Sequence, residues 1–560
     1  MSLHAQGEFM PYSKLFIIFL SAIITTSGFA KVEKAKLIVV ISIDQFRADY
    51  LQKFSSSFLP ATQGNKIGGF NYLMTKGAYF SHAQYGILQN MTGPGHATIL
   101  TGSYPYQNGI GNNDWYDAET QNFVYCTEDQ SQKTVGANPS NIHVGTSPKN
   151  LIGTTFGDEL KNAFPNSRVI AISLKDRAAI LMGGHRADIA LWFDLESFQW
   201  VSSEYYLTSK GLPDWVLEKN LQMKKMVGLQ QTWENKNAKN LSDNSNVVDS
   251  SATKDMGKTF PHKAKIGGPS SLLFPMAVDM PEEMAMKAIE VLKLGQTKAT
   301  DVLAISFSNH DYVGHNFGPE SEEIKETTIH EDKTIAHFLN FLDKKIPGGL
   351  KNIWVVLTAD HGVSDNPKIL AANKIPSGII DQETMLIALE KFLTNKYGKA
   401  PNKWMVGVSE LNFYLNRKEI REHNLDLATI QKEAAKYLTS TSEYKKGIAQ
   451  IFSADDVKNH TLPAEQFERQ ILRTYFEGRS GDIVMIPKPN YVISYATTTH
   501  LTGHSYDRYV PMIFLGKPFR AGLYASGFVV DIAPTLSFLM GIIPPTNSEG
   551  AILDFALNIN

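Results

Sequence analysis

The sequence is poor in cysteine and has no excess of charge of either sign. Cys126 is the only cysteine in 560 residues, which excludes an internal disulfide and a thiolate metal cluster. Any bound metal must therefore be held by oxygen and imidazole ligands. The chain has 54 Lys and Arg against 56 Asp and Glu, so nothing in its charge favours nucleic acid as a partner. Because 43% of the residues are hydrophobic, the chain can bury a large core and is not predominantly disordered.

Long hydrophobic runs are also missing, and the most apolar segment is short and close to the N-terminus. Residues 15–24 (LFIIFLSAII) follow Lys14, and Gly28 and Ala30 precede a plausible cleavage point. This arrangement is typical of a secretory signal peptide, with an uncleaved anchor or a buried helix as the alternative. We therefore expect residues 1–30 to be removed. The mature chain, residues 31–560, should be periplasmic or secreted, without stable membrane insertion.

Four short apolar segments rich in β-branched residues predict buried parallel strands. They span residues 36–43, 168–174, 302–308 and 353–358. Helical patterns lie between them. One covers residues 284–294, where Glu282 and Glu283 would favour the N-terminal dipole, and another covers residues 321–342, with Ser321 as a candidate N-cap. Strands that alternate with helices predict an α/β fold, with a mostly parallel central sheet covered by helices on both faces.

The remaining regions suggest insertions into one catalytic domain that spans residues 31–560. Residues 235–254 are polar and aperiodic, which predicts a surface loop within an insertion at about 186–275. A helical pattern at residues 425–438 lies in a second insertion, at about 402–487. Residues 529–540 return to a core-like composition, and no internal repeat is evident.

Charged or metal-binding residues follow each of the four predicted strands. They are Asp44 after the first strand, Lys175 and Arg177 after the second, His310 and Asp311 after the third, and Asp360 and His361 after the fourth. A single acidic residue after a strand is usually a turn former or an N-cap. Four such cases together are better explained by a site, because ligands bind at the carboxyl ends of the strands of an open α/β sheet.

Two pairs within this set have the chemistry of metal ligands. Asp311 and His315 are four residues apart, so on a helix both side chains would share a face and reach one divalent ion. Asp360 and His361 are adjacent and would need a loop to converge. For either pair alone, a surface ion pair is the alternative.

Residues 90–102 (NMTGPGHATILTG) predict a helix whose N-terminus could bind an anion. Thr92 suits an N-cap, Pro94 suits the first turn, and Gly102 can end the helix. Free N–H groups and the dipole at that end attract phosphate or sulfate, although a capped structural helix would look the same. A threonine hydroxyl is a poor nucleophile at neutral pH unless a Lewis-acid metal lowers its pKa.

Taken in order, these motifs resemble the alkaline phosphatase superfamily, over nearly all of the mature chain. The matching motifs are Asp44 after a strand, Thr92-Gly-Pro-Gly-His96, Asp311-x3-His315, Ala359-Asp-His-Gly362, Thr498-Thr-His500, 506–514 (YDRYVPMIF) and 530–536 (VDIAPTL). Within the superfamily, the chain resembles the bacterial phosphate-irrepressible, PafA-like alkaline phosphatases. Three features carry this closer resemblance: a threonine nucleophile position, Asn112-Asn-Asp-Trp115, and Lys175-x-Arg177.

The resemblance implies a phosphate monoester hydrolase that works through a phospho-threonine intermediate on Thr92, with two Zn²⁺ ions per chain. The implied ligands of the first zinc are Asp311, His315 and His500. Those of the second are Asp44, Asp360, His361 and the Thr92 oxygen. The implied contacts of the phosphoryl oxygens are Asn113, Lys175, Arg177 and the backbone N–H of Gly93. Two fixed cations there would favour a dianionic monoester over a monoanionic diester.

Several alternatives remain open at this level. His504 competes with His500 for the last ligand position, but only His500 lies 14 residues before Phe514, as the ligand does in the family, without a gap. A phosphodiesterase of the nucleotide pyrophosphatase type would keep the same metal ligands. A non-catalytic metal-dependent binding protein is a further alternative. A sulfatase is disfavoured because the helix lacks the Cys or Ser motif from which formylglycine is made.

Overall fold

The computed structural model describes residues 33–118, 120–136, 145–207, 211–235, 246–462, 467–493 and 496–558. The predicted signal peptide, residues 1–30, lies outside the described residues. Within those ranges, no helix combines the length and the apolar character that a membrane span requires.

A ten-stranded sheet forms the centre of the molecule, in the order β22-β4-β21-β14-β1-β13-β8-β9-β10-β7. Its two edge strands are β22 (Gly522–Phe528) and β7 (Thr134–Val135). The four predicted strands are confirmed as its neighbouring central strands: β14 (Ile353–Thr358), β1 (Leu37–Ile43), β13 (Asp301–Phe307) and β8 (Val169–Ser173). They run parallel, and Leu37 is in register with both Asp301 and Ile353. Every residue of these strands is buried, because helices cover both faces of the sheet.

The edges of the sheet are mixed, which the apolar runs did not predict. β21 (Tyr509–Leu515) lies antiparallel to β14, and β4 (Ala78–Gln84) lies antiparallel to β21. On the other side, β9 (Ile189–Asp194) is parallel to β8, and β10 (Gln199–Ser203) turns back beside β9. The α/β class with a parallel centre is confirmed.

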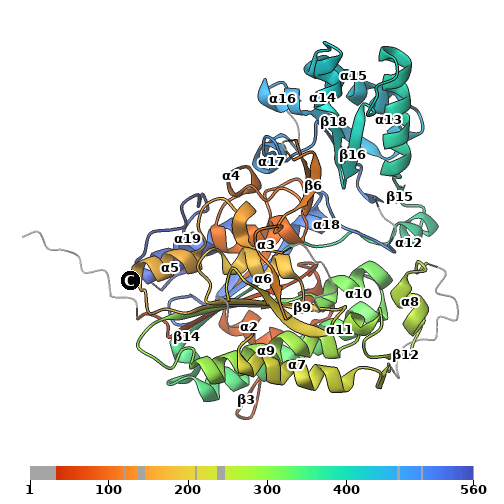
Figure 1. Ribbon diagram of the computed structural model, residues 1–560. Coiled ribbons are helices and arrows are strands. Elements are labelled where there is room, and N and C mark those ends of the chain that lie inside the picture. Colours follow the sequence, from red (N-terminus) through yellow and green to blue (C-terminus); the bar gives the residue numbers. More distant parts are fainter. Residues whose placement is uncertain are drawn as a thin grey trace, which may run out of the picture.

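Helices cover both faces of this sheet (Figure 1). One face carries α7 (Asp214–Met226), α9 (Met276–Leu292) and α11 (Glu322–Lys345), and the other carries α3 (Thr92–Thr101), α5 (Phe156–Ala163), α6 (Asp176–Gly183) and α19 (Ile532–Met540). The N-cap predicted for α11 is confirmed, since the Ser321 side chain accepts a hydrogen bond from the Ile324 N–H.

Helix α9 begins earlier than predicted. It starts at Met276, so Glu282 and Glu283 lie in its interior and do not act on its N-terminal dipole. Pro281 lies inside the helix, although proline has no backbone N–H to donate and is usually found in the first turn of a helix. The preceding turn is held instead by tertiary packing, because Ala277 and Val278 are fully buried.

A smaller unit stands to one side of the sheet, at the top of Figure 1. Its four-stranded sheet has the order β16-β17-β19-β18, formed by β16 (Met405–Ser409), β17 (Asn412–Leu415), β19 (Ile483–Pro487) and β18 (Ile448–Ser453). It packs with α13 (Gln382–Tyr397) and α15 (Leu427–Ser440), the helix predicted at residues 425–438. Trp404 is fully buried in its separate hydrophobic core. We call this part the small unit.

The loop predicted at residues 235–254 is partly wrong. Residues 236–245 lie outside the described ranges, but Ser251–Met256 form helix α8. A reciprocal capping box starts this helix, because the Ser250 hydroxyl accepts from the Thr253 N–H and the Ser250 N–H donates to the Thr253 hydroxyl. Met256 is buried, which anchors an otherwise polar segment.

Candidate active site

The residues predicted to follow the central strands lie together beyond the carboxyl ends of those strands. This is expected, because parallel strands all end on the same side of the sheet. Asp44 follows β1, while Asp360 and His361 follow β14. Asp311 and His315 lie on α10 (Asn309–Phe317), directly after β13. Of the remaining predicted residues, Thr92 lies at the start of α3, Lys175 and Arg177 lie at the start of α6, and His500 lies in the loop before β21. Asn113 lies in the turn before β5 (Asp114–Asp117).

One cluster of possible metal ligands is formed by Asp44, Asp360 and His361. All three side chains are buried, and one ligand atom from each lies within 4.8 Å of the others. Nε2 of His361 is 3.4 Å from an oxygen of Asp44 and 3.4 Å from one of Asp360. Among the described residues, this nitrogen has no hydrogen-bond partner. A buried donor set of two carboxylates and an imidazole suits a divalent cation.

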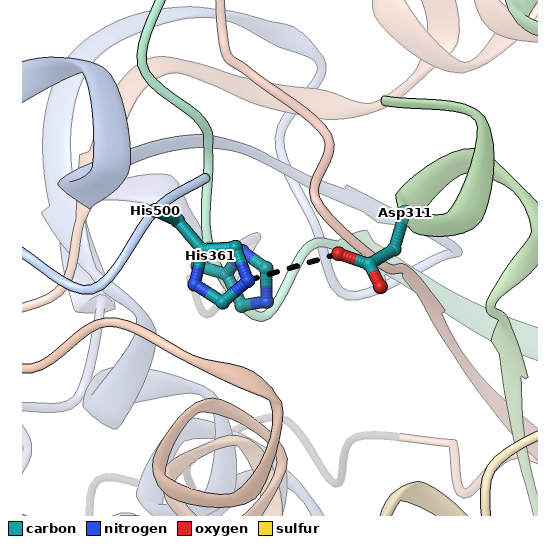
Figure 2. Close-up of side chains that lie close together, drawn as sticks. All are labelled: Asp311, His361 and His500. Carbon is teal, nitrogen blue, oxygen red and sulfur yellow. Dashed lines mark ion pairs between the residues drawn. The ribbon is translucent and has the colours of Figure 1, made fainter. Parts of the chain in front are cut away.

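A second cluster is formed by Asp311, His361 and His500, again with ligand atoms within 4.8 Å of one another (Figure 2). Nε2 of His500 lies 3.8 Å from Oδ1 of Asp311. Nε2 of His315 lies 3.2 Å from the same oxygen, as expected for residues four apart on a helix. His361 thus lies near both clusters, and its ring stacks on that of His500 with centroids 3.7 Å apart.

The three imidazoles are oriented in the same way. Nδ1 of His315 is 3.0 Å from the Thr498 carbonyl, Nδ1 of His361 is 2.9 Å from the Gly362 carbonyl, and Nδ1 of His500 is 2.8 Å from the Asn90 carbonyl. A carbonyl can only accept, so each Nδ1 carries a proton. Each Nε2 faces the cluster and can offer it a lone pair once that nitrogen is deprotonated. Backbone contacts of this kind fix metal-binding histidines in proteins. The residues present therefore fit a pair of divalent ions.

His504 points elsewhere. Its Nε2 lies 2.9 Å from the Pro487 carbonyl, and its ring packs against Phe467 and Tyr506. Of the two candidates for the last ligand position, only His500 presents a ring nitrogen to the acidic cluster.

The threonine lies beside both predicted phosphate-binding cations. Oγ1 of Thr92 is 3.3 Å from Nζ of Lys175 and 3.3 Å from Nη2 of Arg177. The Lys175 ammonium also lies 2.7 Å from Asp44 and 2.6 Å from Asp311, so it bridges the two clusters. The side-chain oxygen of Asn113 accepts the N–H of Gly93 at 2.8 Å. These residues form a single polar pocket around the Thr92 hydroxyl.

The predicted capping role of Thr92 is wrong. Met91 occupies the N-cap position without a side-chain cap, and Thr92 is the first helical residue. Its hydroxyl is therefore free to face Lys175 and Arg177. The predicted end of the helix is confirmed, because Gly102 adopts φ 63° at its C-terminus, where glycine is favoured.

The electrostatics of the site reflect crowded carboxylates. Burial and the nearby Asp44 charge raise the pKa of Asp360. Burial opposes ionisation of Asp44, but Lys175 and His361 together outweigh it and hold the pKa of Asp44 well below its usual value. Burial disfavours the His361 cation, but Asp360 and Asp44 together raise its pKa to about 9. Without a divalent ion, protons and Lys175 thus balance the negative charge of the site.

Two supporting residues were not predicted from the sequence. Gln45 donates from Nε2 to Asp311 at 2.7 Å and from its backbone N–H to Asp360 at 3.0 Å, which links the two clusters. Tyr125 accepts a hydrogen bond from Arg177 at 3.0 Å and orients the guanidinium. The position of Gln45 directly after Asp44 could have indicated its role, whereas Tyr125 is distant in sequence and gave no indication. His96, the last residue of the Thr92-Gly-Pro-Gly-His96 motif, lies 3.2 Å from Asp360.

Comparison with known proteins agrees with this geometry. The type I phosphodiesterase / nucleotide pyrophosphatase family matches residues 38–507. Alkaline phosphatase PhoV of Synechococcus elongatus is 34% identical over 93% of both chains, and alkaline phosphatase PafA of Elizabethkingia meningoseptica is 32% identical over 93% of this chain and 94% of its own.

Solved structures give the same result. A crystal structure of wild-type alkaline phosphatase PafA superposes with a TM-score of 0.84 at 31% identity, covering 94% of this chain and all of that one. A murine ectonucleotide pyrophosphatase / phosphodiesterase shares the fold, with a TM-score of 0.52 at 13% identity. The chain therefore belongs to the type I phosphodiesterase / nucleotide pyrophosphatase family within the alkaline phosphatase superfamily, and it is an enzyme of the alkaline phosphatase type.

Proposed function

We propose that this enzyme hydrolyses phosphate monoesters, with Thr92 as the nucleophile at a site for two Zn²⁺ ions. One observation carries the proposal: the Thr92 hydroxyl lies 3.3 Å from both Lys175 and Arg177, next to two buried clusters of carboxylates and imidazoles. The relatives named alkaline phosphatases support the same activity.

The proposed metal ligands divide into two groups. Asp311, His315 and His500 would hold one ion, and Asp44, Asp360, His361 and Thr92 would hold the other. Bound Zn²⁺ would supply Lewis acidity, lowering the pKa of a hydroxyl and stabilising negative charge on a departing oxygen. The backbone carbonyls at Nδ1 keep the three imidazoles in the tautomer that this role requires.

The chain's own residues account for the rest of the reaction. Oγ1 of Thr92 would form a bond to phosphorus while the bond to the ester oxygen breaks, which gives a phospho-threonine that water then hydrolyses. Charge on the three equatorial oxygens needs donors that are already in place. Lys175, Arg177 and Asn113 would provide them. The N–H of Gly93, which donates to the Asn113 side chain in this structure, would join them by exchanging that hydrogen bond for one to the phosphoryl group.

The two cations favour a monoester over a diester. A monoester presents a dianionic phosphoryl group. Lys175 and Arg177, both within hydrogen-bond range of Thr92, could neutralise its two charges once bound metal offsets Asp44 and Asp311, with which Lys175 is paired here. A diester carries one charge and needs room for a second ester group. We therefore rank a phosphodiesterase activity, which the name of the matching family would suggest, as the second candidate.

The test is to assay the purified enzyme with p-nitrophenyl phosphate and bis-p-nitrophenyl phosphate, with and without chelator. We expect chelator-sensitive turnover that favours the monoester, and loss of that preference in Lys175→Ala and Arg177→Ala.

Thr92→Ala should abolish the phospho-enzyme while zinc still binds, as measured by elemental analysis. Faster turnover of the diester would support the second candidate, and no metal-dependent turnover of either would leave a binding protein.

We also propose that residues 1–30 are a cleaved signal peptide, so that the enzyme acts in the periplasm or outside the cell. N-terminal sequencing of the exported protein should begin at Lys31. An N-terminus within residues 1–30 of the exported protein would contradict this assignment.

A further inference from the structure

A hairpin of the small unit ends beside Asn113 of the proposed active site. Strands β16 and β17 are joined by the two residues Glu410 and Leu411. The Ser409 hydroxyl donates to the Asp114 carbonyl at 3.0 Å and accepts from the Asn112 amide at 3.2 Å. Asn113, a proposed phosphate ligand, lies between those two residues. The hairpin tip is therefore attached to the segment that lines the phosphoryl pocket.

The far side of the hairpin is held as well. Asn412 donates to the side chain of Gln89 at 3.0 Å, three residues before Thr92. Leu411 is fully buried in the core of the small unit. With Ser409, Leu411 and Asn412 all engaged, the hairpin fixes the backbone from which the Glu410 side chain extends.

The backbone at Glu410 has an unfavourable conformation for a glutamate. Its φ is 52°, in the left-handed region, at a hairpin position where glycine is the usual residue. The carboxylate is half-buried and makes no hydrogen bond with any residue in the described ranges.

The charges around Glu410 belong to the site. Its carboxylate is within electrostatic range of Arg177, of the proposed metal ligand His315 and of a second carboxylate, Asp114. Asp114 in turn is within range of Arg177 and Asp176. Lys175 is already paired with Asp44 and Asp311, whereas the acidic side chains within electrostatic range of Arg177 include Glu410 and Asp114.

We propose that Glu410 is a specificity-determining residue of this site. Its carboxylate, which the β16–β17 hairpin presents, favours monoesters whose leaving alcohol carries a positive charge, such as an amino alcohol. It disfavours monoesters whose leaving alcohol carries a further negative charge. The inference rests on the proposed function, in which His315 belongs to the ligand group beside the departing oxygen. The phosphoryl group binds on Thr92, Lys175 and Arg177, and Glu410 acts on the alcohol.

The test compares three monoesters that share a phosphoryl dianion and differ in the alcohol. Phosphoethanolamine has a cationic alcohol, glycerol 2-phosphate a neutral one, and 3-phosphoglycerate an anionic one. Dividing each kcat/KM by that of glycerol 2-phosphate removes any effect of Glu410 on the phosphoryl group. In Glu410→Gln, the normalised value should fall about three- to tenfold for phosphoethanolamine and rise by a similar factor for 3-phosphoglycerate.

Two controls separate charge from structure. Glu422→Gln removes the same charge from an exposed position on helix α14 (Arg417–Glu422) of the small unit and should leave both ratios unchanged. Glu410→Gly suits the positive φ, so it should reproduce the shift seen in Glu410→Gln while thermal stability is kept or raised. The shift should also shrink at high salt, because the interaction is between charges.

The possible outcomes separate the two proposals. Turnover of all three monoesters with the same ratios in wild type and Glu410→Gln would overturn the role of Glu410 alone. An equal shift in Glu422→Gln would overturn it too, since the effect would then be one of net charge. If the wild-type enzyme hydrolysed none of the monoesters, the proposed function would fail and this inference with it.

Discussion

At the scale of single residues, the orientation of each histidine ring shows whether it can bind a metal at the site. His315, His361 and His500 each use Nδ1 on a backbone carbonyl, which leaves Nε2 for the buried carboxylate clusters. His504 uses Nε2 on a carbonyl and lies among aromatic rings. The local contacts thus distinguish residues of the same type that are only four positions apart.

The first residue-scale prediction concerns these two histidines. His500→Ala should lower the zinc stoichiometry of the purified enzyme and its kcat/KM by at least about a hundredfold, because one ligand is lost. His504→Ala should retain zinc and lose only packing against Phe467 and Tyr506. Elemental analysis alongside kinetics measures both effects. Zinc loss confined to His504→Ala would transfer the ligand role to that residue.

The second residue-scale prediction follows from the pKa of His361, which is about 9 in the metal-free site. Below that pH the imidazole is protonated, and zinc must displace the proton in order to bind. Zinc affinity should therefore rise with pH by up to about tenfold per unit and level off above the pKa of His361. Chelator competition at a series of pH values measures this slope. An affinity that is constant from neutral pH to pH 9 would contradict it.

At the scale of elements, the site depends on how closely α3 approaches the loop after β14. A Cβ at Gly95 would lie 2.3 Å from the Asp360 carbonyl oxygen and 2.7 Å from the Asp360 Cβ, so only glycine allows this contact. The close approach places Thr92, at the start of α3, beside the carboxylate clusters.

Gly95→Ala should therefore push α3 away from Asp360. We expect a loss of about 1–3 kcal/mol in the free energy of unfolding, together with weaker zinc binding and a lower kcat. Ala97→Gly on the same buried helix is the matched control, since it costs about 1 kcal/mol in helix propensity without touching Asp360. Denaturant unfolding and zinc titration test the pair. Equal zinc affinity in both variants would show that the contact does not position the site.

At the scale of the whole molecule, the proposed metal ligands and the small unit belong to different cores. Asp44, Asp311 and Asp360 follow the central strands of the large sheet, whereas Trp404 and Leu411 belong to the core of the small unit. The hairpin that ends at Glu410 connects the two at the active site.

Removal of metal should therefore destabilise the large core first. Zinc that binds only the folded state adds about 4 kcal/mol to the free energy of unfolding when its concentration is a thousandfold above its Kd. Chelation removes this contribution. We expect calorimetry to show a lower Tm with chelator. Trp404→Ala should cost about 3–5 kcal/mol in the small unit and leave the zinc-dependent shift intact. Unfolding that is identical with and without chelator would argue against a structural contribution of the metals.

Much of the fold could be predicted from the sequence because its indicators are local. Continuous apolar runs predicted the four central strands, and the residue after each run predicted the edge of the sheet at which the site lies. The mixed edges, the early start of α9 and helix α8 were missed. In each case packing against distant residues, such as burial of Val278 or Met256, outweighed the local preference.

The sequence alone determined which chemical groups are available: oxygen and imidazole ligands without thiolates, one threonine at a helix start, and two cations after a strand. Only the tertiary structure decided how they are combined. It placed His361 between both clusters, turned His504 away, and brought Glu410 of the small unit within electrostatic range of Arg177. The physical reason is that these relations join residues from separate segments of the chain, and only packing of the whole chain sets the distances between them.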